Sequence, residues 1–159
     1  YRGFIFFGLM NVDGDPYVIE YNARLGDPES EVILPRIESD FYDLLEGAAR
    51  RDLANRQLMT ASDTAVTVMM VAGGYPDSYQ KGFPIAGTES VRASTVFHAG
   101  TRVADGRLVT SGGRVLAVTS RGATMREALD KSYKSVSEIF FEGMNYRKDI
   151  GFDLKTEER

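Results

Sequence analysis

Cysteine is absent from this chain of 159 residues, and histidine occurs only once, as His98. Without cysteine the chain can form neither a disulfide nor a zinc site with thiolate ligands. A single histidine also argues against a histidine-based metal site or a histidine-rich catalytic cluster. The lack of cysteine fits a reducing compartment, and we therefore expect a cytoplasmic location.

Long apolar runs and a basic excess are missing as well. No stretch approaches the roughly 20 apolar residues that a membrane-spanning helix needs, and no basic region followed by a cleavage site opens the chain. The formal net charge is -4, with acidic and basic residues interspersed, whereas a protein that neutralises a phosphate backbone carries a basic patch. We expect a soluble chain with no targeting segment and with neither a membrane nor a nucleic acid as partner.

What is present is ordinary for a folded protein. Hydrophobic residues make up 43% and charged residues 26% of the chain, and 16 glycines indicate many turns. The length is sufficient to bury a core in one domain or in two small ones. The chain begins at Tyr1 and enters an apolar run within a few residues, so we expect its start to lie inside a larger protein.

The first 60 residues predict a hairpin followed by helices. Residues 4–10 are apolar throughout, residues 11–16 form a turn cluster, and residues 17–22 alternate, which predicts a β-hairpin with a buried first strand. Asp27 fits a helix N-cap and Pro28 fits the first helical turn, so a short helix is expected to follow.

A second helix is predicted after Ser39 or Asp40, either of which can cap it. The apolar residues that follow have the spacing of one helical face; they are Phe41, Leu44, Leu45, Ala48, Ala49 and Leu53. Polar residues then interrupt the pattern, and we place a domain boundary near residue 60.

The remaining residues, 61–159, predict a mainly β domain. Strands are expected at residues 65–71, 95–98 and 114–119, with a hairpin turning at Asp105-Gly106. Thr124 and Glu127 form a capping box before an apolar stripe that reaches Phe140, so a helix should cover one face of the sheet. The tail, residues 155–159, is expected to fray. The fold class is therefore α+β.

Two oxygen-bearing side chains stand out on the strand over residues 17–22. Side chains alternate along a strand, so Glu20 and Asn22 should share one face while Tyr17, Ile19 and Tyr21 occupy the other. Their α-carbons would lie about 6.6 Å apart, which lets both side chains reach one hard cation such as Mg²⁺. A Glu and an Asn on a solvated strand face are commonplace, and the pair alone favours that ordinary explanation.

A longer pattern surrounds this pair. The run YVIEYNARLGDPE over residues 17–29 resembles the signature of phosphoribosylamine-glycine ligases, and further matching segments follow in the family's order. These are GGYP at residues 73–76, HAGT at 98–101, SGGRV at 111–115 and YRKDIG at 146–151. The resemblance covers roughly residues 3–152.

The resemblance implies an ATP-grasp enzyme of purine biosynthesis that joins glycine to 5-phosphoribosylamine with ATP hydrolysis. The glycine carboxylate would take the γ-phosphoryl group, and the amine would then attack the glycyl phosphate. Residues 1–60 would be the C-terminal part of the ATP-grasp domain, and residues 61–159 the C-terminal mainly β domain. Glu20 and Asn22 match the family's ligands for Mg²⁺ or Mn²⁺.

Other residues of the matching segments are candidates for substrate contacts. Arg24 would lie on the same face as Glu20 if the strand persists, and we assign it transition-state stabilisation, with pairing to Asp27 or Glu29 as the alternative. The run Gly26, Asp27, Pro28 and Glu29 precedes a helix start, whose free amides can bind anions, although two acids favour ribose hydroxyls over phosphate.

Two further positions lie in the second half. The Gly112-Gly113-Arg114 turn lets the backbone approach a ligand and leaves Arg114 available to an anion, and plain turn chemistry accounts for the glycines equally well. His98, Arg147 and Lys148 are expected to be structural or solvated residues rather than catalysts.

The chain departs from the wider ATP-grasp pattern in two ways. Residues 4–10 contain no acid where these enzymes usually place another metal ligand, and nothing resembles the glycine-rich phosphate-covering loop or the adenine-pocket lysines. Those parts precede residue 1 in the family, so the missing N-terminal part of the same enzyme is an expected partner. We expect the 159-residue chain alone to have little or no ligase activity.

Three alternatives remain. A folded interaction domain with no chemistry of its own would leave the polar face of Glu20, Asn22 and Arg24 unexplained. Of the other two, one is the C-terminal region of another ATP-grasp ligase or carboxylase, which the GDPE and RKDIG segments disfavour. The other is a non-catalytic sandwich-type module, such as a carrier of biotin or lipoate, but the Asp105-Gly106 turn has no lysine at its tip.

Overall fold

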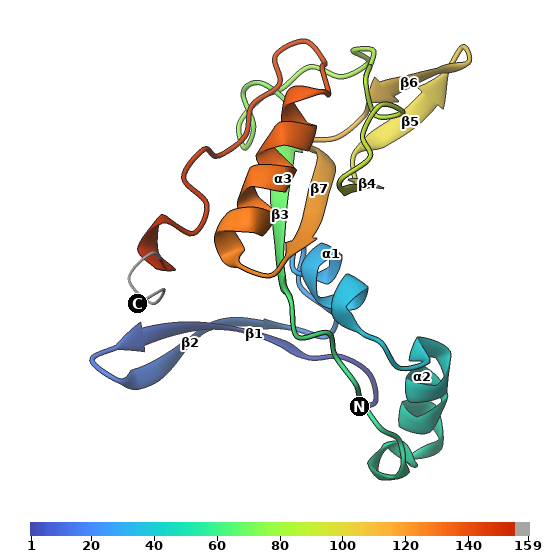
Figure 1. Ribbon diagram of the computed structural model, residues 1–159, viewed down its shortest axis with the longest axis vertical. Coiled ribbons are helices and arrows are strands. Elements are labelled where there is room, and N and C mark those ends of the chain that lie inside the picture. Colours follow the sequence, from blue (N-terminus) through green and yellow to red (C-terminus); the bar gives the residue numbers. More distant parts are fainter. Residues whose placement is uncertain (155–159) are drawn as a thin grey trace. The chain divides into compact units, whose positions relative to one another are not determined.

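The protein is described by a computed structural model over residues 1–154 (Figure 1), and the tail expected to fray, residues 155–159, lies outside the described residues. The chain divides into two compact units, Tyr1–Ser62 and Asp63–Arg159. Helices and strands are mixed, and every pair of neighbouring strands is antiparallel. Among residues 1–154, no helix combines the length and apolar content that crossing a bilayer requires.

A β-hairpin opens the first unit. Strand β1, Phe6–Val12, pairs with β2, Asp15–Asn22. Asp13 and Gly14 form the turn with φ angles of 53° and 96°, and the Asn11 side chain accepts a hydrogen bond from the Gly14 amide at 2.9 Å. Positive φ at both central residues is what a tight two-residue hairpin turn requires, so the predicted turn cluster has the expected chemistry.

The hairpin is exposed on both sides, so the prediction of a buried first strand is wrong. Phe7 is 55% exposed in β1 and Tyr21 is 72% exposed in β2, and their rings pair across the strands at 6.3 Å. The sheet has two strands only, and neither face carries a second layer within the first unit. Apolar alternation reports which faces can be buried, but burial also requires a covering element.

Short helical segments follow the hairpin. Helix α1, Ser30–Ile33, continues into the 3₁₀ turn η1, Leu34–Arg36, and its N-cap position is Glu29, whose side chain makes no capping hydrogen bond. The prediction that Asp27 is the N-cap is therefore wrong: residues 27–29 form a turn, with a cis peptide bond before Pro28, and the helix begins two residues later than a cap at Asp27 would place it.

Helix α2, Phe41–Arg50, is the longest helix of the first unit and begins as predicted. The Asp40 side chain accepts hydrogen bonds from the amides of Tyr42 and Asp43 at 2.9 and 3.2 Å. Arg51 ends the helix in the left-handed region with φ of 63°, and the 3₁₀ turn η2, Leu53–Asn55, follows. Stacked rings of Phe4 and Phe41, 6.1 Å apart, tie the segment before β1 to α2.

The second unit contains the main sheet. Strands β3, Thr64–Val71, and β4, Thr95–His98, flank β7, Arg114–Gly122, in the order β3-β7-β4. Strands β5, Thr101–Ala104, and β6, Arg107–Thr110, form a separate hairpin. Its turn, Asp105-Gly106, has φ angles of 48° and 72°, as predicted for this dipeptide.

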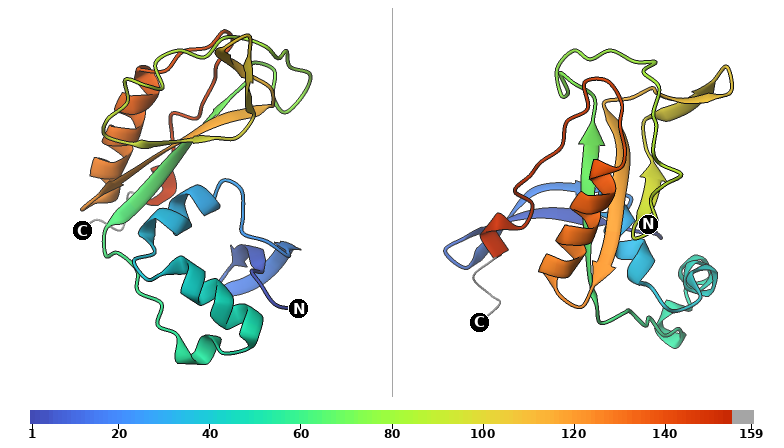
Figure 2. Two further views of the ribbon diagram at one scale, coloured as in Figure 1. Left: turned by 90° about the vertical axis from the view of Figure 1, so that its right-hand side faces the viewer. Right: turned by 45° about the horizontal axis from the view of Figure 1, so that its top comes forward.

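Helix α3, Met125–Ser137, lies along β3 and β7 in the views of Figure 2. Thr124 caps it, while the Glu127 carboxylate accepts from the Ala123 amide at 2.8 Å. The helix ends before Phe140, which is 62% exposed and pairs in an isolated bridge with Ala86, so its predicted place on the helix face is wrong. A 3₁₀ turn, η3, Phe152–Leu154, closes the described chain.

The hydrophobic core of the second unit lies between this helix and the sheet. Its members come from β3, β7, α3 and the segments that follow them. They are Val68, Met70, Ala72, Ile85, Val91, Val115, Leu116, Val118, Val136, Ile139 and Phe141. All members of this core belong to the second unit.

Candidate functional site

Glu20 and Asn22 lie side by side at the end of β2. The Asn22 amide nitrogen is 3.5 Å from a carboxylate oxygen of Glu20, and Glu20 is exposed while Asn22 is half-buried. Glu20 pairs with Gly8 of β1, and a methyl group on Gly8 would lie 3.1 Å from Cγ of Glu20. A glycine at this position therefore leaves room for the Glu20 stem to lie across the strand.

The pair fits a cation that takes few ligands from the protein. Mg²⁺ is usually held by one or two carboxylates together with phosphate oxygens and water. Within residues 1–154, no group of three or more acidic or histidine side chains gathers around a point that could hold a metal ion. Glu20 and Asn22 could supply two oxygens, once the amide of Asn22 presents its oxygen, and the remaining ligands would come from elsewhere.

A β-bulge changes which neighbours share this face. Glu20 pairs with Gly8 but Val18 pairs with Leu9, so Ile19 is an extra residue of β2. Tyr17 pairs with Met10, and residues two apart on the unbulged β1 share a face. Tyr17 therefore lies on the face of Glu20 and Asn22, and the strict alternation that placed it on the opposite face does not hold.

Arg24 lies beyond the strand. β2 ends at Asn22, residues 23–24 form a bend, and the guanidinium of Arg24 donates to the carbonyl oxygen of Leu25 at 2.8 Å. The condition under which Arg24 would share the face of Glu20, a strand that persists to residue 24, is not met. Its side chain is exposed and close in sequence to the pair, so its assigned role stays a prediction.

The run Gly26 to Glu29 forms a compact turn before α1. The amide and the hydroxyl of Ser30 both donate to the carbonyl of Gly26, at 3.0 and 2.6 Å, and the amide of Glu31 donates to the carbonyl of Pro28. These bonds occupy the first amides of a four-residue helix, so α1 offers no free-amide anion site of the kind expected. The predicted substrate contacts of Gly26, Asp27, Pro28 and Glu29 now depend on side chains and the turn itself.

Arg114 opens β7 in the second unit. Gly112 and Gly113 precede it, and its carbonyl oxygen accepts the amide hydrogen of Gly100 at 2.8 Å. A methyl group on Gly100 would lie 2.6 Å from the α-carbon of Gly112, so the two glycines permit two backbones to touch. The expected close approach is therefore made by another loop of the chain, and Arg114 itself is half-buried.

Two of the other polar candidates, His98 and Arg147, have partners within the chain, and Lys148 is exposed. Nδ1 of His98 lies 3.1 Å from the hydroxyl of Thr101. Arg147 pairs with Asp149 through two hydrogen bonds of 2.9 and 3.1 Å, and this pairing lowers the pKa of the Asp149 carboxyl. Both members of the pair are exposed.

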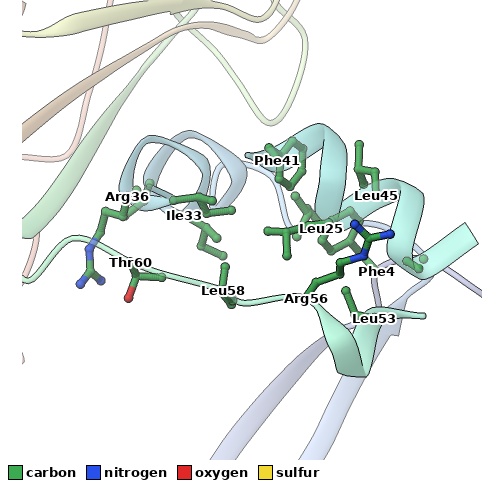
Figure 3. Close-up of a pocket in the computed structure, with 15 residues that line it drawn as sticks. Phe4, Leu25, Ile33, Arg36, Phe41, Leu45, Leu53, Arg56, Leu58 and Thr60 are labelled. Carbon is green, nitrogen blue, oxygen red and sulfur yellow. The ribbon is translucent and has the colours of Figure 1, made fainter. Parts of the chain in front are cut away.

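The sequence did not predict an apolar groove in the first unit (Figure 3). It has a volume of about 550 Å³, and Phe4, Leu25, Ile33, Phe41 and Leu58 converge on it from five different segments. The apolar stripe of α2 was the available signal, because it was recognised as a face to be buried. In the structure, the stripe lines an open groove.

Residues 65–153, more than half of the chain, match the family model described as "Phosphoribosylglycinamide synthetase, C domain". The chain belongs to this family.

The similar proteins are longer than this chain and are named for ligation or purine biosynthesis. The chain is 43% identical over 150 residues to "Phosphoribosylamine--glycine ligase" of Caldanaerobacter subterraneus subsp. tengcongensis, a match that covers 94% of this chain and 36% of that protein. It is 46% identical to the protein of the same name from Chlorobaculum tepidum, covering 95% and 36%. It is also 43% identical to "Trifunctional purine biosynthetic protein adenosine-3" of Gallus gallus, covering 96% and 16%.

A solved structure has the same fold. The crystal structure of a phosphoribosylamine-glycine ligase from Thermotoga maritima matches with a TM-score of 0.81 and 42% sequence identity, over 94% of this chain and 37% of that one. The chain thus spans about a third of the length of these bacterial relatives.

Proposed function

We propose that this chain is part of an ATP-dependent ligase that joins glycine to 5-phosphoribosylamine and forms glycinamide ribonucleotide. The observation that carries the proposal is the adjacency of the Glu20 carboxylate and the Asn22 amide on one face of a hairpin, in a chain whose relatives are named as such ligases. A carboxylate and an amide side by side suit a reaction in which phosphate oxygens share a cation with the protein.

The reaction moves two groups in sequence. A glycine carboxylate oxygen takes the γ-phosphoryl group of ATP and releases ADP, after which the amine of phosphoribosylamine attacks the acyl carbon and releases phosphate. Mg²⁺ or Mn²⁺, when bound, neutralises the charge that accumulates on the transferred phosphoryl group. Glu20 and Asn22 would hold the cation, with the remaining ligands drawn from phosphates and water.

The cationic and polar side chains would align the reactants. Arg24 would stabilise the phosphoryl group in the transition state once its guanidinium leaves the carbonyl of Leu25. Gly26, Asp27, Pro28 and Glu29 would contact the ribose, to whose hydroxyls carboxylates can accept hydrogen bonds. Arg114 would bind an anionic group of a substrate.

The rest of the ligase is the partner that this chain requires. We infer that residues 1–60 complete an ATP-grasp domain, and that the remaining part of the full-length protein covers the apolar hairpin faces and the groove lined by Phe41. Support comes from the relatives, which are almost three times as long as the matched segment. Residues 61–159 would be the C-terminal domain, with α3 covering its sheet, and the cytoplasmic location expected from the cysteine-free sequence stays a prediction.

Glu20→Gln in the full-length protein tests the proposal. The substitution removes the negative charge and keeps the shape, so phosphate release that depends on both glycine and phosphoribosylamine should fall by at least about 100-fold if the metal assignment holds. Glu38→Gln, an exposed carboxylate of the same unit, is the matched control and should leave the rate unchanged. A Glu20→Gln enzyme with ordinary activity would remove the metal assignment.

A further inference from the structure

The turn before Arg114 contacts the loop that follows β3. The carbonyl oxygen of Gly113 accepts the amide hydrogen of Ala72 at 2.8 Å, and the amide of Tyr75 donates to the carbonyl of Ala72 at 3.1 Å. These bonds bring the Tyr75 ring directly against Gly113, where a methyl group on residue 113 would overlap Cδ2 of the ring. The ring occupies the space that any other side chain at residue 113 would need.

The ring of Tyr75 also packs against a second aromatic ring. Tyr75 and Tyr79 pack edge to face with their centroids 6.1 Å apart. The ammonium group of Lys81 lies 5.6 Å from the centroid of Tyr79. Tyr75 is 37% exposed, and its hydroxyl makes no hydrogen bond with residues 1–154, so its contribution here comes from the ring rather than from the polar group.

The strand next to this turn is irregular. Met70 pairs with Leu116 whereas Val71 pairs with Arg114, so Val115 is an extra residue that bulges from β7. A bulge re-aims the side chains beside it and leaves the strand end less firmly paired. The backbone at residues 112–114 is held by hydrogen bonds with Gly100 and Ala72, and the ring of Tyr75 packs directly against Gly113.

We propose that Tyr75 is a positioning residue for Arg114, and that its ring holds the Gly112-Gly113-Arg114 turn so that the guanidinium meets an anionic group of a substrate. The inference rests on the proposed function through the role given to Arg114. The anion is either the phosphate of phosphoribosylamine or the carboxylate of glycine. Both offer the paired oxygens that a guanidinium fork binds.

Steady-state kinetics of the full-length enzyme test the inference. Arg114→Gln should raise KM for one anionic substrate about tenfold, the usual cost of a lost charged hydrogen bond, and the substrate affected identifies the anion. Tyr75→Leu should raise KM for the same substrate by about fivefold and leave kcat and the other KM values within about twofold, because the loosened turn weakens binding only there. Tyr75→Phe keeps the ring and should behave as the parent enzyme.

The double variant separates positioning from general stability. If Tyr75 acts through Arg114, Tyr75→Leu combined with Arg114→Gln should have the KM of Arg114→Gln alone. Effects that multiply, or a folded Tyr75→Leu enzyme with unchanged KM values, overturn the inference. Should Tyr75→Leu fail to fold, Gly113→Ala displaces the same ring and must give the same pattern.

Failure of the inference and failure of the proposed function give different experimental results. If Arg114→Gln leaves every KM unchanged, Arg114 does not bind a substrate and the inference fails with that role. If Arg114→Gln raises a KM but Tyr75→Leu does not, only the positioning role of Tyr75 is rejected. The metal assignment is decided independently by Glu20→Gln.

Discussion

At the scale of single residues, the cap of α3 is a local interaction whose removal can be measured. The hydroxyl of Thr124 accepts the amide hydrogen of Glu127 at 3.2 Å. Thr124→Ala leaves that amide without its partner and should lower the free energy of unfolding by about 1 kcal/mol, as read from urea denaturation followed by circular dichroism. Thr124→Ser keeps an acceptor oxygen and should lose clearly less. Equal losses in both variants would show that the cap bond is not responsible.

Glu127 also gives a prediction about pH. The hydrogen bond from Lys131, at 2.7 Å, and then that from the Ala123 amide hold the pKa of the Glu127 carboxyl below its ordinary value of 4.5. A depressed folded pKa means that the interaction stabilises the fold above pH 4.5 and that this contribution is lost as the pH falls through the folded value. Lys131→Met should therefore raise the pKa of Glu127 towards 4.5.

Carbon-13 NMR of the Glu127 carboxyl during a pH titration measures this shift. Lys134 lies on the same helix and makes no ion pair with Glu127, so Lys134→Met is the matched control. It should leave the pKa of Glu127 unchanged. A Glu127 pKa that is unmoved by Lys131→Met would mean that the ion pair does not persist in solution. The effect on stability should be small, because both side chains are exposed to solvent that screens their attraction.

At the scale of secondary-structure elements, the second unit is stabilised mainly by buried residues such as those of the central strand β7, and much less by the separate β5–β6 hairpin. Val118 of β7 is fully buried, whereas Val103 of β5 is 71% exposed. Val118→Ala removes two methyl groups from the core and should cost about 2 kcal/mol in unfolding free energy, while Val103→Ala should cost less than about 0.5 kcal/mol. Chemical denaturation of the two variants makes the comparison, and similar losses would contradict the location of the core.

Elements with strong local signals could be predicted from the sequence. The caps at Asp40 and Thr124 and the turn at Asp105-Gly106 occur as expected, because each depends on interactions within a few residues. The strands over 65–71 and 95–98 were also found within one residue of their ends. Such elements can be predicted because they depend on residues close in sequence and require no knowledge of distant partners.

Features that depend on distant partners were missed. The bulge at Ile19 follows from the pairing of β1 with β2, and alternation alone could not reveal it, so Tyr17 was assigned to the wrong face. The segment at Asp27 resembles a helix start in sequence, but the structure forms a turn there, and the amides of Ser30 and Glu31 after it donate to the carbonyl oxygens of Gly26 and Pro28. For the site itself, the adjacency of Glu20 and Asn22 was predictable, since the strand continues through both residues. The bend that redirects Arg24 was not.

At the scale of the whole molecule, the two units differ in how far they satisfy their own apolar surface. The second unit buries a continuous core between α3 and the sheet. The first unit leaves Phe7, Leu9, Val18 and Tyr21 exposed on one hairpin face and keeps an open apolar groove. Contiguous exposed apolar surface of this kind marks a place where another protein surface packs. The first unit therefore offers such a surface at the hairpin and at the groove.

Polar substitutions on the hairpin face should have different consequences in the 159-residue chain and in the full-length protein. Leu9 and Val18 are cross-strand partners, so Leu9→Lys with Val18→Glu keeps the strands paired through an ion pair and removes apolar surface. In the 159-residue chain the double substitution should reduce binding of the dye ANS, while Val103→Lys in the second unit should not.

In the full-length protein the same face would be covered, and two buried side chains of this size stabilise by about 1.5–3 kcal/mol each. The substitution should therefore lower the Tm of the full-length protein substantially. Unchanged Tm there, with reduced dye binding in the short chain, would mean that this face stays open to solvent in the complete enzyme.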